Sequence, residues 1–344
     1  MRRLPVYFVL DCSESMIGEP IAQMESGIRS ICRDLRSDPN ALETAFVSVI
    51  AFAGVAKTIV PLVELLGFSL PALPLGSGTN LGAALDVLAA ELERNIQPTS
   101  ATRKGDWRPI VYVFTDGKPT EDPDAAIARW KSTKWSHAGI VAVGFGPHAD
   151  VSTLRKLSDS VLLYSGSSPT DFGKFIKWVT ASVTLQSTRL SDSGDSIVAA
   201  IDNNILKVIK GTPNSCTIDT DLTVVGRCST KGDPYILKYE SLLDDRQVET
   251  QGPQDQYEYS SAYKITNEYF SWSANTIQKI TVNTAALYGS PKCIHCNNQY
   301  GLAICSCGNV LCVAGTDELV TCPWCKRASV FGQFGNVDVG RGLG

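Results

Sequence analysis

The sequence has few histidines, no long hydrophobic run and no excess of positive charge. Only three of its 344 residues are histidine, which argues against a catalytic zinc centre built from imidazoles. No stretch approaches the roughly 18 to 20 apolar residues of a membrane-spanning helix, and the apolar run at residues 5–10 is too short for a secretion signal. The formal charge of −4 provides no overall attraction for nucleic acid or acidic membranes. These absences predict a cytoplasmic protein that binds neither nucleic acid nor membrane.

The first half of the chain alternates between two kinds of hydrophobic pattern. From Ile17 to Leu35, apolar residues recur in steps of three and four, as on one face of a helix. Between such segments lie near-continuous apolar runs, which are typical of strands buried on both faces of a parallel sheet. The alternation predicts an α/β fold, a doubly wound and mostly parallel sheet of the Rossmann-like kind. The expected strands are residues 6–10, 45–54, 110–116, 139–146 and 160–165, and further helices are expected after residue 80, at 122–135 and at 168–183.

The composition changes near residue 185, so the sequence predicts a second domain. A polar segment follows, and from about residue 215 threonine, tyrosine and valine alternate with turn signals, which favours short β-strands. The end of the chain is rich in glycine. We therefore predict an α/β domain at 1–186, a linker at 187–214, a small β-rich domain at 215–330 that ends in a cysteine zinc site at about 291–328, and a flexible tail at 331–344.

Polar side chains follow the first expected strand in an unusual pattern. Asp11, Ser13 and Ser15 alternate along an extended segment, so their side chains can point to one side. Asp116 ends another expected strand, and Thr79 lies in a glycine-rich loop that opens a helix. Because ligands collect at the carboxyl ends of parallel strands, we expect these five oxygen donors to meet at one edge of the sheet. An oxygen-only set suits Mg²⁺ or Mn²⁺ better than zinc.

Each piece of this pattern also has an ordinary explanation. Ser13 or Ser15 could simply cap the following helix, and the segment 115–120 could be a plain turn closed by Gly117. The glycine-rich loop around Thr79 could be flexible or could bind phosphate, although it lacks the lysine of a Walker motif. The cation site is favoured because all the pieces occur together, each beside an expected strand.

Residues 4–184 resemble a von Willebrand factor A domain. The motif D-x-S-x-S of that family corresponds to Asp11, Ser13 and Ser15, and the later threonine and aspartate correspond to Thr79 and Asp116. The resemblance implies a six-stranded, mostly parallel sheet and a metal-ion-dependent adhesion site. It also implies that the two serines and the threonine bind the ion directly, that the aspartates bind directly or through water, and that a partner's carboxylate completes the octahedron. One departure is that Glu14 adds a negative charge near the ion.

Seven of the eleven cysteines fall within 33 residues near the end of the chain. In a reducing compartment such a cluster indicates metal binding rather than disulfides. The two C-x-x-C pairs have the spacing of a closed, structural four-thiolate zinc site. The predicted ligands of this single zinc are Cys293, Cys296, Cys322 and Cys325.

Two other ligand sets remain open for the cysteine-rich segment. Cys305, Cys307 and Cys312 are expected in a hairpin between the two pairs, and Cys305 and Cys307 could form half of a site. With His295, the segment holds eight soft ligands, which is enough for two zinc ions. The remaining cysteines are scattered along the chain, at Cys12, Cys32, Cys216 and Cys228.

The combination of the two halves resembles the TerY family of bacterial tellurium-resistance-associated proteins. The segments that carry this resemblance are 226–240, 287–296, 305–312 and 322–325. It implies a non-enzymatic scaffold that docks partner proteins, a metal-dependent Ser/Thr protein phosphatase and a Ser/Thr protein kinase, in a tellurite-stress or phage-defence phosphorylation system. The alternatives are a metal-dependent hydrolase and a zinc-ribbon nucleic-acid binder. Against these stand the absence of a nucleophile–base motif and of a basic stripe.

Overall fold

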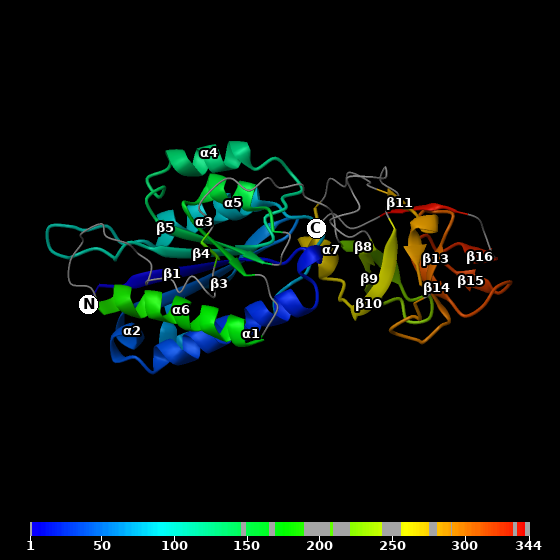
Figure 1. Cartoon of the computed structure of the whole chain (residues 1–344), viewed down its shortest axis with the longest axis horizontal. Helices are drawn as coiled ribbons and strands as arrows, with labels where there is room; N and C mark the ends of the chain where they lie inside the picture. The colour runs from blue at the N-terminus through cyan, green and yellow to red at the C-terminus, as the bar shows by residue number, and fades with distance from the viewer. Residues whose placement is uncertain are drawn as a thin grey trace. The chain divides into compact units, whose positions relative to one another are not determined.

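The computed structural model describes residues 2–145, 149–164, 169–188, 207–208, 221–242, 256–274, 281–289, 291–332 and 336–340. The chain divides into two compact units, which Figure 1 shows in the colours of the sequence. Unit 1 comprises Met1–Pro74 and Gly78–Thr217 together with Gly344, and unit 2 comprises Leu75–Ser77 and Ile218–Leu343. Most of the predicted linker at 187–214 lies outside the described residues.

Unit 1 contains a seven-stranded sheet in the order β3-β2-β1-β4-β5-β6-β7. The inner strands β2, β1, β4, β5 and β6 are parallel to one another. The edge strands β3 and β7 pair antiparallel with their neighbours. β1 lies near the middle of the sheet, and all eight of its residues are buried, as its unbroken apolar run predicts. The strands are β1 (Leu4–Asp11), β2 (Ala45–Phe52), β3 (Ala56–Glu64), β4 (Ile110–Thr115), β5 (Gly139–Phe145), β6 (Ser160–Tyr164) and β7 (Lys207–Val208).

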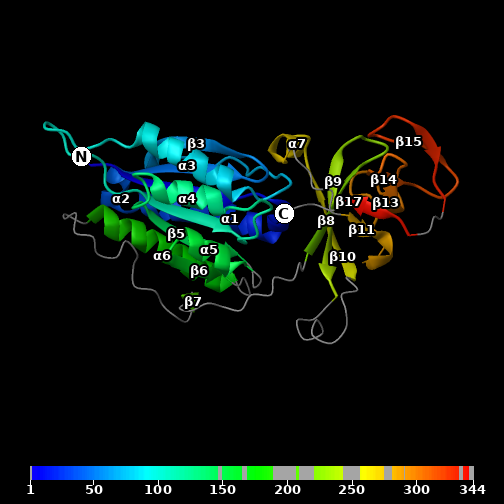
Figure 2. The same ribbon diagram turned by 90° about the horizontal axis from the view of Figure 1, so that it is seen from above.

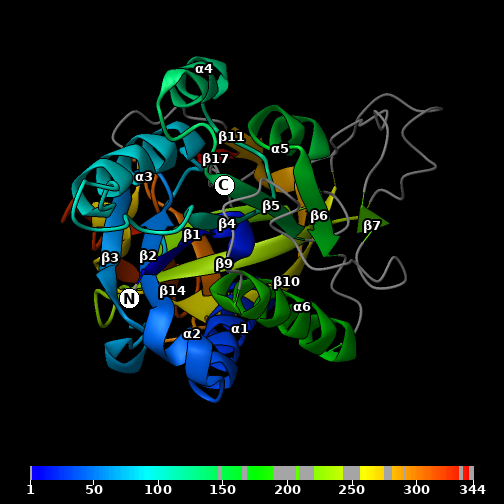
Figure 3. The same ribbon diagram turned by 90° about the vertical axis from the view of Figure 1, so that its left-hand side faces the viewer.

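Helices cover both faces of this sheet. Figure 3 shows α3, α4 and α5 on one face and α1, α2 and α6 on the other. The apolar stripe of α1 buries Met24, Ile28 and Ile31, as its spacing predicts. The helices are α1 (Glu19–Arg36), α2 (Pro39–Thr44), α3 (Leu81–Asn95), α4 (Asp124–Ser132), α5 (Val151–Leu157) and α6 (Pro169–Thr188), with short 3-10 turns at η1 (Glu14–Met16) and η2 (Leu65–Gly67). The predicted doubly wound α/β class is confirmed.

The sequence prediction missed four elements of unit 1. β3 is an edge strand whose residues are mostly exposed or half-buried and include Pro61, so it is not a continuous apolar run. α2 and α5 have only six and seven residues, too few to show a helical period. The two-residue strand β7 also raises the strand number from the expected six to seven, and it falls inside the predicted linker.

Unit 2 is built on a six-stranded sheet in the order β12-β10-β9-β8-β14-β13. The β-rich character predicted for this part of the chain is confirmed, and Figure 2 shows its strands from above. The sheet strands are β8 (Asp221–Arg227), β9 (Pro234–Ser241), β10 (Tyr257–Lys264), β12 (Leu287–Tyr288), β13 (Tyr300–Ile304) and β14 (Val310–Val313); the other elements are α7 (Tyr269–Trp272), η3 (Thr284–Ala286), the pair β15 (Leu319–Thr321) and β16 (Ala328–Val330), and the pair β11 (Thr281–Asn283) and β17 (Asp338–Gly340).

Part of the predicted flexible tail at 331–344 is ordered by strand pairing. β17 pairs antiparallel with β11, and Val339 is buried in the core of unit 2. This strand pairing and the burial of Val339 dock Asp338–Gly340, which the sequence prediction placed in a flexible tail.

None of the described helices is long and apolar enough to cross a lipid bilayer.

Candidate functional site

The carboxyl ends of β1 and β4 bring two of the predicted oxygen donors, Asp11 and Asp116, to one edge of the sheet. Asp11 is the last residue of β1, and the parallel register with β4 places it beside Thr115 and Asp116. The Thr115 hydroxyl donates to Asp11 Oδ2 at 2.5 Å, and the backbone N–H of Ser13 donates to Asp11 Oδ1 at 2.9 Å. These bonds fix the Asp11 carboxylate at the end of its strand.

Ser13 and Ser15 lie together in the loop after β1. Their hydroxyl oxygens are 3.0 Å apart, so the alternating spacing in the sequence does bring both side chains to one side. Ser13 precedes the short η1 turn without capping it, and the N-cap of α1 is Gly18. Helix capping therefore does not explain Ser13.

The loop that carries Thr79 is tied to the same edge by hydrogen bonds. The N–H of Asn80 donates to the carbonyl of Ala53, which follows β2, at 2.7 Å. The N–H of Thr79 donates to the hydroxyl of Thr120 at 3.1 Å, and the N–H of Thr120 donates back to the carbonyl of Thr79 at 3.2 Å. Since Thr120 follows Asp116 in the same loop, these bonds connect the threonine and aspartate segments.

Among the five predicted donors, the Thr79 side chain gives the clearest indication of a bound ion. Its hydroxyl oxygen is buried and has no hydrogen-bond partner among the residues that the structure describes. A buried hydroxyl without a partner costs about 1–3 kcal/mol, so each such group calls for an explanation, and a ligand is one. The side chain of Asn80, not Thr79, caps α3 by accepting from the N–H of Ala83. The hydroxyl of Thr79 is therefore available to a cation.

Two carboxylates at this edge raise the local negative potential. Asp11 is fully buried, and Asp116 is 8% exposed. Burial, together with the nearby Asp116 carboxylate, raises the pKa of Asp11 to about 7. A divalent cation would relieve both effects by neutralising the pair. The donors are all oxygens, so the residues fit a hard ion such as Mg²⁺ or Mn²⁺.

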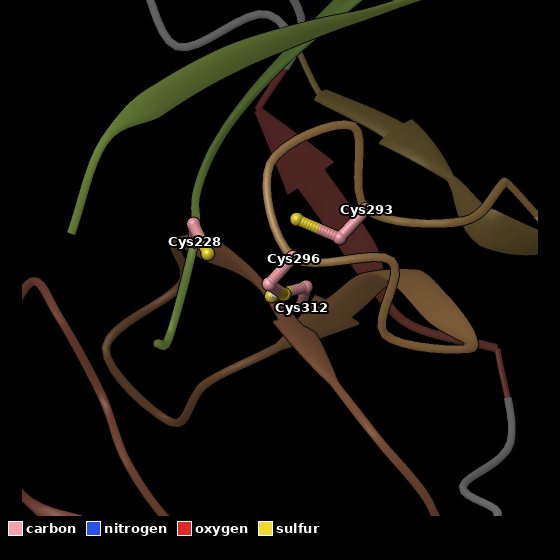
Figure 4. A group of neighbouring side chains, drawn as sticks. All are labelled: Cys228, Cys293, Cys296 and Cys312. Carbon is pink, nitrogen blue, oxygen red and sulfur yellow. Dashed lines mark hydrogen bonds between the residues drawn. The ribbon is translucent and has the colours of Figure 1, made fainter. Parts of the chain in front are cut away.

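The cysteines of unit 2 form two separate groups rather than one. The first cysteine cluster consists of Cys228, Cys293, Cys296 and Cys312, which Figure 4 shows with their side chains converging. The second cysteine cluster consists of Cys305, Cys307, Cys322 and Cys325. In each cluster all four sulfurs lie within 4.8 Å of one another. This corrects the prediction of a single site formed by Cys293, Cys296, Cys322 and Cys325, because its two pairs belong to different clusters.

The sulfur separations fit tetrahedral metal coordination. In the first cluster, Cys296 Sγ and Cys312 Sγ are 3.6 Å apart. In the second, Cys305 Sγ lies 3.7 Å from Cys325 Sγ, and Cys307 Sγ lies 3.9 Å from Cys322 Sγ. A disulfide requires about 2.05 Å, whereas four sulfurs placed about 2.3 Å from a zinc ion are separated by about 3.8 Å. The clusters are therefore prearranged for Zn²⁺.

The same backbone turn presents the C-x-x-C pairs of both clusters. The N–H of Asn297 donates to the carbonyl of Cys293 at 2.8 Å, and the N–H of Lys326 donates to the carbonyl of Cys322 at 3.0 Å. Asn297 and Lys326 both have positive φ, of 64° and 63°. The equivalent bond from Gly232 to Cys228 spans 2.8 Å, again with a positive φ at the donor. Cys228 thus begins a third turn of this kind.

Cys228 is the member of the first cysteine cluster that sequence reasoning missed. It lies 65 residues before Cys293 and was grouped with the scattered cysteines. The parallel register of β8 with β14 pairs Arg227 with Leu311, so Cys228 and Cys312 follow side by side. The glycine four residues after Cys228 was a usable signal, because it matches the position of Asn297 after Cys293. His295, which was the eighth candidate, instead bonds the carbonyl of Pro234 through Nε2 at 2.9 Å.

The thiols of the first cluster ionise unequally. Burial raises the pKa of Cys228 and of Cys293. Burial also acts to raise the pKa of Cys296, but hydrogen bonds from the Asn298 backbone and from Thr230 outweigh it and lower that pKa to about 7. Cys296 therefore offers a thiolate to a metal more readily than Cys228 or Cys293 does.

Comparisons with known proteins assign a family to each half. Residues 6–178 match the von Willebrand factor type A domain, and residues 219–344 match the TerY-C metal binding domain. The human inter-alpha-trypsin inhibitor heavy chain H6 is 24% identical over 159 residues, which cover 44% of this chain and 12% of that protein. The chain thus spans only a small part of this curated relative.

Solved structures resemble the first half at low sequence identity. The conserved hypothetical protein BatB from Bacteroides thetaiotaomicron is 16% identical, with a TM-score of 0.38 over 53% of this chain and 99% of that chain. The von Willebrand factor type A protein from Catenulispora acidiphila is 21% identical, with a TM-score of 0.39 over 53% of this chain and 43% of that one.

The family assignment explains the arrangement of both metal-binding regions. A von Willebrand factor type A domain is a protein-binding module, typically non-catalytic, whose adhesion-type site suits a divalent metal. The second half is a metal-binding domain, and its two four-cysteine clusters indicate zinc. With the first match covering half of the chain, the protein belongs to the von Willebrand factor type A domain family and joins that domain to a TerY-C metal binding domain, the combination expected of the TerY family.

Proposed function

We propose that the chain is a metal-dependent scaffold that docks a partner protein through a divalent ion. Asp11, Ser13, Ser15, Thr79 and Asp116 would hold Mg²⁺, or Mn²⁺, at the carboxyl edge of the sheet. The observation that carries the proposal is the buried, unpartnered hydroxyl of Thr79 at the same edge as two carboxylates. The ion would supply an open coordination position to a carboxylate from the partner.

The cysteine clusters are assigned a structural role in this proposal. Each would hold one Zn²⁺ through four thiolates, which leaves no position for a substrate. One sulfur pair of the first cluster and two of the second already lie near the tetrahedral separation. The zinc ions would therefore stabilise unit 2 as a second surface for protein partners.

The identity of the partners rests on the TerY resemblance. We propose a metal-dependent Ser/Thr protein phosphatase and a Ser/Thr protein kinase, in a cytoplasmic bacterial pathway of tellurite stress or phage defence. A scaffold role agrees with the typically non-catalytic character of the domain family. The formal charge of −4 speaks against nucleic acid as the partner.

The proposal is tested by capturing partners from host lysate with purified protein as bait. Wild-type protein with Mg²⁺ is expected to retain the phosphatase or the kinase, whereas EDTA or the double variant Ser13→Ala/Ser15→Ala is expected to release it. The matched control is Ser30→Ala/Ser37→Ala, which removes one hydroxyl from α1 and one from its C-cap and should retain the partners. Because EDTA also extracts zinc, the double variant is the decisive arm. Equal recovery by the double variant and the wild type would overturn the docking role of the ion.

A further inference from the structure

The two cysteine clusters of unit 2 differ in how far solvent reaches their sulfur ligands. In the first cluster, Cys228, Cys293 and Cys312 are buried and Cys296 is half-buried. In the second cluster Cys307 is exposed, and it is the one exposed cysteine among the residues that the structure describes. Because oxidation of a thiolate requires contact with a dissolved oxidant, the second cluster is the more accessible target.

Cys307 lies in an open turn between β13 and β14. Ser306, Gly308 and Asn309, which surround it in the sequence, are exposed as well. The N–H of Gly308 donates to the carbonyl of Cys305 at 2.8 Å, and Gly308 has a positive φ of 81°. A Cβ placed on Gly308 would meet no heavy atom beyond its chain neighbours within 4 Å. A molecule as small as a peroxide can therefore reach this turn.

A second sulfur lies close to Cys307. Cys307 Sγ is 3.9 Å from Cys322 Sγ, and Cys305 Sγ is 3.7 Å from Cys325 Sγ. These separations suit two ligands of one zinc ion, and a disulfide requires about 2.05 Å. Disulfide closure therefore needs a movement of about 2 Å, which side-chain rotation in an exposed turn can help to supply. Cys322 is buried, so the oxidant reaches Cys307 first.

Loss of the second zinc would leave most of unit 2 in place. The second cluster forms a small core of its own with Leu311, Val313 and Phe331, separate from the core that holds the first cluster. The neighbouring strands β15 and β16 pair only with each other, as a two-stranded sheet. A two-stranded hairpin by itself is marginally stable in water. Removal of this zinc would therefore release β15–β16 while the first cluster still holds the six-stranded sheet.

We infer that the second cysteine cluster is a peroxide-sensitive zinc switch in which Cys307 reacts first. Oxidation of this cluster would expel its zinc and free β15–β16, and the first cluster would keep its zinc. The inference rests on the proposed occupation of both clusters by zinc. It goes beyond the structural role assigned to them, because it makes one of the two ions releasable.

The reaction needs one equivalent of hydrogen peroxide. The Cys307 thiolate attacks one peroxide oxygen, the O–O bond breaks, and hydroxide leaves with its electron pair, so that a sulfenic acid forms. The Cys322 thiolate then attacks the Cys307 sulfur and expels a second hydroxide, which gives the disulfide. The two sulfurs lose two electrons, the two peroxide oxygens gain them, and two protons from water convert both hydroxides to water. Zinc then retains only two thiolate ligands and dissociates.

The inference is tested on zinc-loaded full-length protein treated with hydrogen peroxide. Two zinc ions per chain are expected before oxidation by mass spectrometry. A chromogenic chelator should then detect release of one zinc at least about tenfold faster than the other. Peptide mass spectrometry should find a disulfide between Cys307 and Cys322, and hydrogen exchange should accelerate in β15–β16 but not in β8 and β9. Dithiothreitol with added zinc should reverse each change.

Two matched variants separate the reactive sulfur from zinc binding itself. Cys307→His keeps a zinc ligand, as in Cys₃His sites, but removes the oxidisable thiolate. It should bind two zinc ions and release neither under conditions that release one from the wild type. Cys296→His makes the same exchange at the half-buried cysteine of the first cluster and should release the second zinc like the wild type.

The outcomes distinguish the switch from the zinc proposal beneath it. Protein without zinc in the second cluster would overturn both. Two bound zinc ions that leave at equal rates, or equal release from Cys307→His and the wild type, would overturn only the switch. The wild-type disulfide map decides independently of either variant, because a disulfide that does not include Cys307 would overturn its role as the first residue to react.

Discussion

The adhesion-type site and the cysteine clusters both fit metal ions, but they depend on their surroundings in opposite ways. The oxygen donors are at the ends of strands that are already hydrogen-bonded and buried along their whole length. In unit 2 the thiols are themselves part of the hydrophobic core, where Cys228, Cys293 and Cys312 pack with Tyr235 and Leu237. The comparison indicates that unit 1 can fold without its ion, whereas unit 2 needs its zinc to close its core.

The two cysteine clusters also differ from each other. The first shares a core with the central strands of the six-stranded sheet. The second packs with only a few residues, among them Leu311, Val313 and Phe331, and its Cys307 is exposed. The pair β15–β16 lies next to this second cluster, and its outward side chains Leu319 and Val330 are exposed. The second zinc is therefore expected to hold a local element, and the first zinc the whole unit.

The largest effect is expected from Cys228→Ser in the first cluster. The variant should unfold unit 2 and lose both zinc ions, because both clusters lie in that unit and structural zinc contributes on the order of 10 kcal/mol to folding. Zinc content by mass spectrometry and β-sheet circular dichroism measure both losses. The control is Cys32→Ser, which changes a buried cysteine of α1 outside both clusters and should keep two zinc ions. Normal zinc content in Cys228→Ser would contradict the assignment of this ligand.

A smaller, local effect is expected from Cys322→Ser in the second cluster. The second zinc should be lost and hydrogen exchange in β15–β16 should accelerate, while β8 and β9 stay protected. The double variant Cys293→Ser/Cys322→Ser sharpens the test. It should lose two zinc ions, whereas a single site built from the two C-x-x-C pairs would lose only one.

Thr79→Ala should affect metal binding far more than stability. Loss of one hydroxyl ligand should weaken Mg²⁺ binding at least about tenfold, a loss of about 1.4 kcal/mol. The melting temperature without metal should stay level or rise, because the substitution removes an unpaired buried hydroxyl. Thermal melts over a Mg²⁺ titration measure both quantities. Thr79→Ser retains the hydroxyl and serves as the control; equal Mg²⁺ responses of the alanine and serine variants would exclude Thr79 as a ligand.

The smallest effect is expected from Thr120→Val. It removes the hydroxyl that accepts from the N–H of Thr79 but retains the backbone bond in the other direction. The lost hydrogen bond contributes about 1 kcal/mol to holding Thr79 in place, so its removal should weaken Mg²⁺ binding severalfold without abolishing it. Isothermal titration of Mg²⁺ into Thr120→Val and into the Thr79 variants compares their Mg²⁺ affinities. A loss as large as that of Thr79→Ala would mean that Thr120 is itself a ligand.

Much of unit 1 could be predicted because its signals are local. The apolar run of β1 and the stripe of α1 each report burial within a few residues, and parallel strands bring their carboxyl ends to one edge. The alternation of Asp11, Ser13 and Ser15 likewise indicates convergence over a five-residue segment. β3 was missed because an edge strand that is half exposed has no continuous apolar run.

The sequence by itself determined the fold class, the oxygen donors at the end of β1 and the presence of a cysteine-built metal domain. Only the tertiary structure decided which cysteines belong together. The pairing of β8 with β14 joins Cys228 to Cys312, and the hairpin of β13 and β14 places Cys305 and Cys307 in one cluster and Cys312 in the other. The spacing of the cysteines along the chain does not show which of them share a cluster, because a metal binds cysteines that are close in space.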